Sequence, residues 1–418
     1  MRRRHHFAML ASAALAPAWL AIGAGEAPAP RIASARARVH VSAEGEYLIQ
    51  FSSRAAQRSL ATAHLRSEGV ALEPVAPSLF ISLAEMTPGE AEAAAALPGV
   101  VGVDPNDVLH ATDTQPAPPW GLDRSDQADL PLDNGFTYPA SAGSGTTIYV
   151  IDSGINAAHT EFAGRVTPGY DGVQDGWGTD DCFGHGTHVA GTAAGTTYGF
   201  AKAATIVPVR VLDCGGLASL DGVIRGIDWV VANHVSGRAV ANLSIGGDTG
   251  YPTLDHAING LIADGVAVAV AAGNGSGADA CTLSPARAPA ALTVGATTEL
   301  DARSSFSNIG SCIDLFAPGS NIRSAWIGTP TATSVKSGTS MATPLVAGAL
   351  AVLWTQHPTL SALQVQSLLV TSATRNRLTG VGTGSPNLLL YLSPPLSTVL
   401  SAAGRTLPAQ RCSVDPGC

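Results

Sequence analysis

The chain has 418 residues, of which 45% are hydrophobic and 13% charged, so it can bury a large core and is not a disordered polyelectrolyte. The formal net charge is −9, and only Lys202 and Lys336 among the 23 basic residues are lysines. A nucleic-acid-binding protein carries a basic patch. The sequence has none, which argues against nucleic acid as a partner.

The N-terminal segment has the order of a secretory signal. Basic residues precede the apolar run Phe7–Ile22, and small residues and prolines follow it. The run is short for a membrane span, which needs about 20 residues, and an uncleaved anchor is the alternative. We expect residues 1–25 to be a signal peptide, cut between Ala24 and Ala29. The mature protein is then expected to be secreted, with no membrane as a partner.

The six cysteines form an even set in a chain that we expect to be exported, which predicts disulfides. Pairing between sequence neighbours is the simplest of the possible arrangements. A zinc site is the alternative, and it is disfavoured because no two cysteines have C-x-x-C spacing. The cysteines are Cys182, Cys214, Cys281, Cys312, Cys412 and Cys418.

A small α+β domain is predicted for residues 40–110, where strand-like and helix-like stretches alternate. The Pro-rich stretch Ala111–Trp120 that follows is expected to be extended and to act as a linker or cleavage zone. The strand-like stretches are Tyr47–Phe51, Leu79–Leu83 and Val100–Asp104, and the helix-like ones are Ala55–Gly69 and Pro88–Leu97.

From residue 146 onward apolar strands alternate with helices, which predicts an α/β domain with a doubly wound, mostly parallel sheet covered by helices on both faces. Such sheets bind ligands beyond the carboxyl ends of their strands. We assign this domain to residues 111–393 and leave residues 394–418 as a tail. The strands are Thr146–Ile151, Thr205–Leu212, Arg238–Ser244 and Val266–Ala272, and the helices are His185–Gly195, Ser219–Val235, Thr253–Asp264, Ser340–Gln356 and Ser361–Thr374.

Three polar residues stand where strands end or helices begin. Asp152 directly follows an apolar strand, His185 lies between glycines, and Ser340 opens a long apolar helix. Each has a structural alternative, because an Asp there can cap a turn and a Ser can cap its helix. His185 and His188 could instead share a metal, but no acid of the H-E-x-x-H type separates them, which favours a packed role for His188. Pro344 is expected in the first turn of its helix, where the missing N–H is tolerated.

Asn274, which lies between glycines after another strand, could donate a hydrogen bond to an oxyanion or could be a turn residue. The order Asp152, His185, Asn274, Ser340 follows the chain order of subtilisin. On this order, the chain resembles the subtilisin-like serine peptidases, in particular the proteinase K and aqualysin branch, from about residue 111 to 392. The resemblance also covers Pro119–Asp123, Ser304–Asn308 and the first two cysteine pairs.

The resemblance implies a secreted serine endopeptidase that works through an acyl-enzyme. In it, His185 takes the proton of the Ser340 hydroxyl and Asp152 orients the imidazole. The Asn274 amide and the Ser340 N–H stabilise the oxyanion. It also implies that residues 40–110 are an inhibitor prodomain, which makes the protein a self-processing zymogen cut at His110–Ala111. We expect a monomer.

The same resemblance implies a polypeptide substrate that binds as an added strand. The family usually has Gly-Ser-Gly where this chain has Gly216, Leu217 and Ala218, and the extra bulk is expected to alter binding upstream of the cut. Ala271 and Gly273 are expected to line a primary pocket that prefers apolar or aromatic residues. The other edge of the cleft is expected to consist of Ser244, Ile245, Gly246 and Gly247.

Structural calcium is the cofactor that the resemblance implies, with oxygen ligands only. One site would use Asp314 and the carbonyls of Pro289 and Ala291. Gly135 stands where some relatives have an Asn ligand of the second site, and a solvated acidic loop is the alternative there. The second site would use Asp123, Asp126, Gln127 and Asp133.

Two other functions are open. A non-catalytic binding protein could use the same fold, since fold does not determine function. A lipase-like hydrolase could use the same three residues, but the serine lacks the G-x-S-x-G elbow. The set Asp152, His185, Asn274 and Ser340 favours the peptidase.

Overall fold

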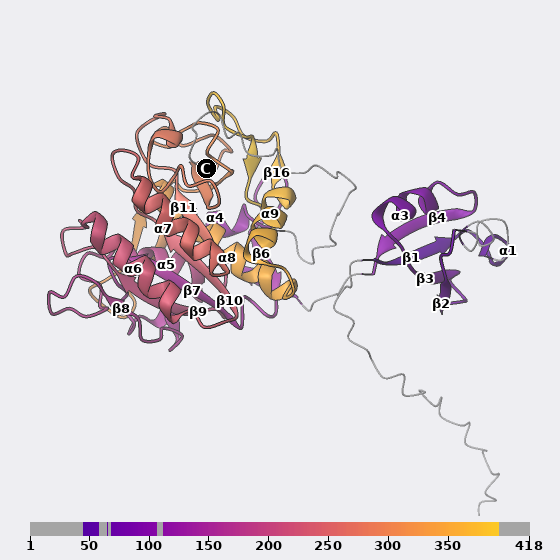
Figure 1. Cartoon of the computed structure of the whole chain (residues 1–418), viewed down its shortest axis with the longest axis horizontal. Coiled ribbons are helices and arrows are strands. Elements are labelled where there is room, and N and C mark those ends of the chain that lie inside the picture. The colour runs from indigo at the N-terminus through magenta and orange to yellow at the C-terminus, as the bar shows by residue number, and fades with distance from the viewer. Residues whose placement is uncertain (1–44, 58–64, 66–67, 107–111, 393–418) are drawn as a thin grey trace, which may run out of the picture. The chain divides into compact units, whose positions relative to one another are not determined.

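The computed structural model describes residues 45–57, 65, 68–106 and 112–392 (Figure 1). The predicted signal peptide, the cut at His110–Ala111, the 394–418 tail and Cys412 and Cys418 lie outside the described residues. Among the described helices, none has both the length and the apolar character that a membrane crossing requires.

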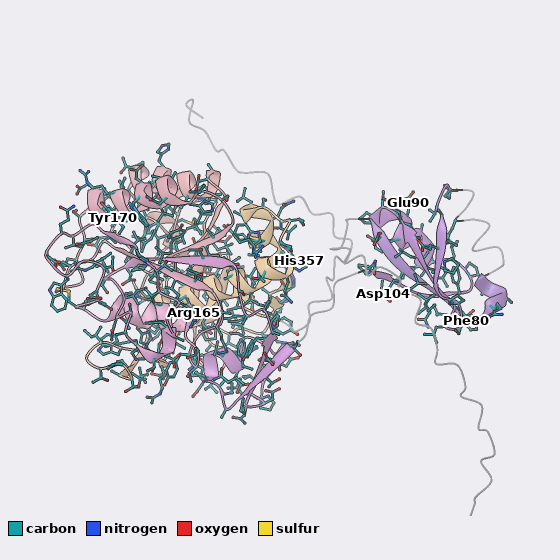
Figure 2. All side chains as sticks on the ribbon, turned by 90° about the horizontal axis from the view of Figure 1, so that it is seen from below. Phe80, Glu90, Asp104, Arg165, Tyr170 and His357 are labelled. Carbon is teal, nitrogen blue, oxygen red and sulfur yellow. A yellow bond between two sulfur atoms is a disulfide. The ribbon has the colours of Figure 1, made fainter. Side chains whose placement is uncertain are left out.

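The described residues between 45 and 106 form a small α+β unit, as the alternation of strand-like and helix-like stretches predicted. Its antiparallel sheet has the strand order β2-β3-β1-β4. Glu90 lies in the first turn of helix α3, where it completes a capping box with Thr87 (Figure 2). The sequence analysis missed the edge strand that contains Pro74. The elements are β1 (Glu46–Phe51), α1 (Arg54–Gln57), β2 (Leu72–Ala76), β3 (Ile81–Glu85), α3 (Pro88–Ala95) and β4 (Val100–Pro105).

The larger unit contains a nine-stranded sheet in the order β16-β17-β13-β12-β11-β10-β7-β9-β8. Every pairing in it is parallel except that of the short strands β16 and β17. The predicted parallel sheet is therefore confirmed. Its strands are β7 (Thr146–Asp152), β8 (Tyr170–Asp171), β9 (Thr205–Arg210), β10 (Arg238–Leu243), β11 (Val266–Ala271), β12 (Leu292–Thr297), β13 (Leu315–Pro318), β16 (Thr374–Arg375) and β17 (Leu388–Leu389).

Helices cover both faces of this sheet because its central strands are apolar on both sides. In β7, Ile148 and Val150 pack in the core with helices α5, α8 and α9, whereas Tyr149 and Ile151 pack with α6 and α7. Figure 1 shows α8 running along the sheet beside β10. The helices are α5 (His185–Ala194), α6 (Leu220–Asn233), α7 (Pro252–Ala263), α8 (Thr339–Gln356) and α9 (Ala362–Ser372).

Within the stretch Ala111–Trp120, residues 112–116 are extended as predicted, but they belong to a sheet and do not form a linker. Residues Thr112–Pro116 form strand β5, which pairs antiparallel with β6 (Gly135–Pro139). Strand β5 is polar and lacks the apolar alternation by which a strand is recognised in a sequence. Thr114, for example, faces Thr137, and their hydroxyl oxygens are 3.2 Å apart. The short helix α4 (Trp120–Asp123) follows.

The expectation for Pro344 is also wrong, because this residue lies in the second turn of α8 rather than in its first. A proline there leaves the carbonyl four residues earlier without its helical donor. That carbonyl belongs to Ser340, and the Ser244 hydroxyl donates to it at 2.9 Å. The missing helical bond is thus replaced by a contact with a distant loop.

Candidate active site

Asp152 is the last residue of the central strand β7 and is fully buried at the carboxyl edge of the sheet. Its Oδ1 accepts the backbone N–H of Ser153 at 2.7 Å. Both carboxylate oxygens also lie within hydrogen-bond distance of Nδ1 of His185, at 2.8 and 2.9 Å. The structure thus joins two of the predicted residues directly.

His185 is the first residue of α5, and its side chain is 21% exposed. Burial lowers the pKa of this imidazole, but the charge and hydrogen bond of Asp152 and the charge of Asp181 raise it, and the net shift is upward. Nε2 has no hydrogen-bond partner among the described residues. The neighbouring Gly186 leaves the space that α5 needs, since a Cβ there would lie 2.2 Å from the Gly154 carbonyl oxygen.

His188 is fully buried, and its Nε2 lies 3.1 Å from the carbonyl oxygen of Ile322. Burial lowers the pKa of His188 to about 4, so the ring is neutral and donates to that carbonyl. These contacts support the packed structural role that the sequence analysis favoured.

Asp181 positions the His185 loop, and the sequence analysis missed it. Its Oδ1 accepts the Ser153 hydroxyl at 2.9 Å and the Gly184 N–H at 2.7 Å. Its Oδ2 accepts the backbone N–H and the hydroxyl of Thr187 at 2.8 and 2.6 Å. The carboxylate therefore caps α5 and ties it to the loop after Asp152. The only signal in the sequence is an acid four residues before His185.

Ser340 is the second residue of α8, and its hydroxyl donates to the carbonyl oxygen of Ser244 at 3.0 Å. Ser244 donates in return to the Ser340 carbonyl and receives the Asn242 amide at 2.9 Å. No hydrogen bond joins Ser340 to His185 among the described residues. The structure therefore fixes the backbone of Ser340 at a helix N-terminus while its hydroxyl rests on the Ser244 loop.

Asn274 follows β11 and is oriented by Thr339, whose backbone N–H and hydroxyl donate to Oδ1 at 2.9 and 3.0 Å. Nδ2 of this amide has no hydrogen-bond acceptor within the part of the chain that the structure describes. A Cβ built on Gly338 would lie 3.6 Å from both Nδ2 of Asn274 and the backbone N of Ser340. The two donors therefore border one small space, which is open because residue 338 is a glycine.

A cavity of about 440 Å³ adjoins Ser340 and Asn274. Its walls include Ala286 and Leu283, and the exposed Asp248 lies at its edge. The predicted residues Gly216, Leu217 and Ala218 do not line it, and the Leu217 side chain is 72% exposed. The predicted residues that do line it are Ser244, Ile245, Gly246, Gly247, Ala271 and Gly273.

Two of the three expected disulfides are present. Cys182 is bonded to Cys214 and Cys281 to Cys312, each with a Cα–Cα distance that suits a disulfide, 5.1 and 5.3 Å. The first of these bonds joins the loop before His185 to the loop that contains Gly216.

Residues 123–137, which we call the acidic loop, hold two carboxylate oxygens without a partner. Oδ1 of Asp123 and Oδ1 of Asp126 are buried and make no hydrogen bond within the described residues. Burial and the charge of Asp133 raise the pKa of Asp123, and burial raises the pKa of Asp126 to about 7. Orphan anionic oxygens of this kind fit a hard cation. The Gln127 amide oxygen, in contrast, accepts the Asp133 N–H at 3.1 Å.

Asp314 is held beside β12, since its Oδ2 accepts the Thr293 N–H at 2.7 Å. Burial raises the pKa of Asp314 to about 7. Thr293 lies two residues after Ala291 and four after Pro289, whose carbonyls the sequence analysis proposed as ligands. The contact places the carboxylate next to the backbone segment that contains both residues.

Comparisons with known proteins agree with this arrangement. The profile of the Subtilase family matches residues 143–387. An extracellular serine proteinase of Thermus is 52% identical over 294 residues, which are 70% of this chain and 71% of that protein. An alkaline serine exoprotease A of Vibrio alginolyticus is 50% identical over 292 residues, 70% of this chain but only 53% of that protein.

The fold is shared as well. A crystal structure of a cold-adapted subtilisin-like serine proteinase matches with a TM-score of 0.63 and 50% identity, and covers 66% of this chain and 98% of its own. The resemblance inferred from the residues is thereby confirmed. The chain belongs to the subtilase family and is a serine endopeptidase.

Proposed function

We propose that Asp152, His185 and Ser340 form the catalytic triad of a secreted endopeptidase that is made as a self-processing zymogen. The observation that carries the proposal is the Asp152–His185 contact of 2.8 Å, with Nε2 of the imidazole free of any described partner. A nucleophile needs such an oriented base. The proposal requires that the Ser340 hydroxyl leave the Ser244 carbonyl by rotation about χ1 and donate to Nε2.

In the proposed reaction, Nε2 of His185 takes the hydroxyl proton as Oγ attacks the substrate carbonyl, and later returns that proton to the leaving amine. The buried Asp152 holds the Nδ1–H tautomer and stabilises the imidazolium. Nδ2 of Asn274 and the Ser340 N–H, which border the space beside Gly338, would donate to the oxyanion. The N-terminus of α8 adds favourable dipole interaction.

The walls of the 440 Å³ cavity support an apolar or aromatic preference before the cut, since Ala271, Ala286 and Leu283 bring no charge. The exposed Asp248 at its edge is the feature that would favour a basic residue instead. Cleavage of a peptide library with the first position varied separates these outcomes, and a preference for Lys or Arg would overturn the apolar assignment.

The prodomain and the secretion signal complete this proposal. The four-stranded sheet and the small core formed by the described residues between 45 and 106 support an inhibitor domain at 40–110, and the name of the Thermus relative supports export. A covering domain that also assists folding suits a parallel sheet, whose non-local contacts form slowly. Calcium would have a structural role at two sites. The unpartnered oxygens of Asp123 and Asp126 would hold one ion, and the Asp314 carboxylate would help to hold the other.

Expression of Ser340→Ala tests the proposal. The variant should keep the mass of the proform and fail to clear casein, whereas the matched control Ser337→Ala should process itself and cleave. Ser337 is a suitable control because it is exposed and, among the described residues, its hydroxyl has a single hydrogen bond, accepted from the Asn321 N–H at 2.9 Å. N-terminal sequencing of the secreted product locates the maturation cut. Normal self-processing by Ser340→Ala would require another nucleophile.

A further inference from the structure

Phe183 is an aromatic residue beside the candidate active site that the proposed mechanism does not use. It lies two residues before His185, and the centroids of the two rings are 6.4 Å apart. The residue is 40% exposed and does not line the cavity next to Ser340. An apolar ring is therefore presented to solvent next to the proposed base, on a surface that the cavity does not include.

The ring packs directly on Gly216. A Cβ built on Gly216 would lie 2.6 Å from Cζ of Phe183 and 2.7 Å from Cε1, so only a glycine leaves room for the ring. Gly216 also has a φ of +77°, which favours glycine. The ring thus spans from His185 to the segment that we expect to form one edge of the substrate cleft.

Both loops that hold this contact are fixed. The Cys182–Cys214 disulfide joins the residue before Phe183 to the residue two before Gly216. The Phe183 N–H donates to Asp181 at 3.0 Å, and Asp213 accepts the N–H of Leu217 at 3.0 Å. The ring is therefore held in place before any ligand arrives, which lowers the entropic cost of binding.

We propose that Phe183 forms an apolar wall for the side chain of the second residue before the scissile bond and selects a large aliphatic or aromatic residue there. The inference rests on the proposed function. Side chains of an extended peptide alternate between opposite faces. If the first residue before the cut enters the cavity, the second points away from it and toward the His185 side, where Phe183 provides the exposed apolar surface.

A carboxylate at that second position would lose water against the ring without gaining a hydrogen-bond partner. An aliphatic one would remove apolar surface of both partners from water. The test is kcat/KM for four peptides that share an apolar first residue and carry Leu, Gly, Asp or Lys in the second position. The mature enzyme should prefer Leu over Gly and Asp by about tenfold or more, the range of a single apolar pocket contact.

In Phe183→Asn the four peptides should have kcat/KM values within about twofold of one another. Phe183→Leu should keep most of the preference for Leu in the second position. Gly216→Ala should act like Phe183→Asn, because the added methyl group displaces the ring. The matched control is Trp177→Ala, an aromatic residue 53% exposed on the same loop, and it should retain the wild-type ratios. Melting temperatures of all variants separate misfolding from lost selectivity.

An unchanged ratio in folded Phe183→Asn, an equal loss in Trp177→Ala, or a wild-type preference for Lys would overturn the role of Phe183. The proposed function fails in a different way, if Ser340→Ala cleaves these peptides as fast as the wild type. With an inert Ser340→Ala and an active wild type, a negative result therefore counts against the Phe183 wall alone.

Discussion

The edge of the sheet and the acidic loop both bury carboxylates but satisfy them differently. Both oxygens of Asp152 contact His185, and one also accepts a backbone N–H. In the acidic loop, one oxygen each of Asp123 and Asp126 has no described partner. Burial alone therefore does not reveal the role of a carboxylate. A protein-satisfied carboxylate can steady another side chain, whereas one with an orphan oxygen is suited to an external cation.

The largest expected effect comes from replacing Asp152, the carboxylate that has hydrogen-bond partners on both oxygens. In Asp152→Asn the side chain keeps its shape, but its amide favours the wrong tautomer of His185, and kcat should fall about 10⁴-fold. Peptide turnover measures the loss. Asp180→Asn is the matched control, since this acid lies exposed on the loop before His185 and should leave kcat close to wild type. Comparable activity in Asp152→Asn would remove Asp152 from the triad.

Asn274→Ala tests whether the Asn274 amide, whose Oδ1 is held by Thr339, donates a hydrogen bond from Nδ2 to the oxyanion. Loss of one such donor typically lowers kcat by about 10²–10³ with little change in KM. Asn308→Ala provides the contrast, because Asn308 is fully buried and its Oδ1 accepts the Gly275 N–H at 2.7 Å. In Asn308→Ala the main effect should therefore be a lower melting temperature rather than a lower kcat. A rise in KM alone for Asn274→Ala would contradict an oxyanion role.

The unsatisfied carboxylates predict stability that depends on calcium and pH. Burial raises the folded pKa of Asp126 to about 7, above its unfolded value. Without metal, the contribution of Asp126 to stability is therefore largest below the unfolded pKa and is lost as pH rises through about 7, where the buried group ionises. Calcium at about 100 times its Kd should raise Tm by roughly 5–10 °C at pH 8.

The gain from calcium should shrink at pH 5, where the carboxyl group holds its proton. Thermal unfolding with calcium and with excess chelator measures both effects. Asp126→Asn should reduce the calcium response and flatten the pH dependence of the metal-free protein. An unchanged melting temperature in excess chelator would count against both proposed sites.

The smallest effect is expected at Lys336, whose Nζ lies 4.3 Å from the Trp326 ring centroid. Burial and Asp152 dominate the pKa of His185, and the charge of Lys336 lowers it in addition. Lys336→Gln should therefore move the acid limb of the kcat/KM profile to higher pH. The displacement should shrink in high salt, which screens exposed charges. Arg323→Gln is the control, because Arg323 lies on the strand that pairs with the strand of Lys336. An equal displacement of the acid limb in this variant would indicate a non-specific charge effect.

Local patterns in the sequence were enough to predict the central strands β7, β9, β10 and β11 and the helices that cover them. The reason is that an apolar strand or a glycine-flanked turn can be recognised from its own segment of the sequence, without knowledge of its partners in space. The pairing of Asp152 with His185 was expected only from the resemblance to the subtilisin-like peptidases. The sequence did not predict the direction of the Ser340 hydroxyl, because its acceptor Ser244 is 96 residues away. The polar strand β5 and the capping role of Asp181 were missed for a related reason, since each depends on a partner in another segment.

Pro344 gives the protein an unusual constraint on improvement by design. Replacing a proline inside a helix normally strengthens that helix. Here a new N–H at residue 344 would bring a second donor to the Ser340 carbonyl, which already accepts the Ser244 hydroxyl and so links α8 to the loop that borders the cavity. A substitution of Pro344 chosen for thermostability would therefore also change the surroundings of a contact beside the cavity, so melting temperature and kcat/KM should be measured together for such a variant.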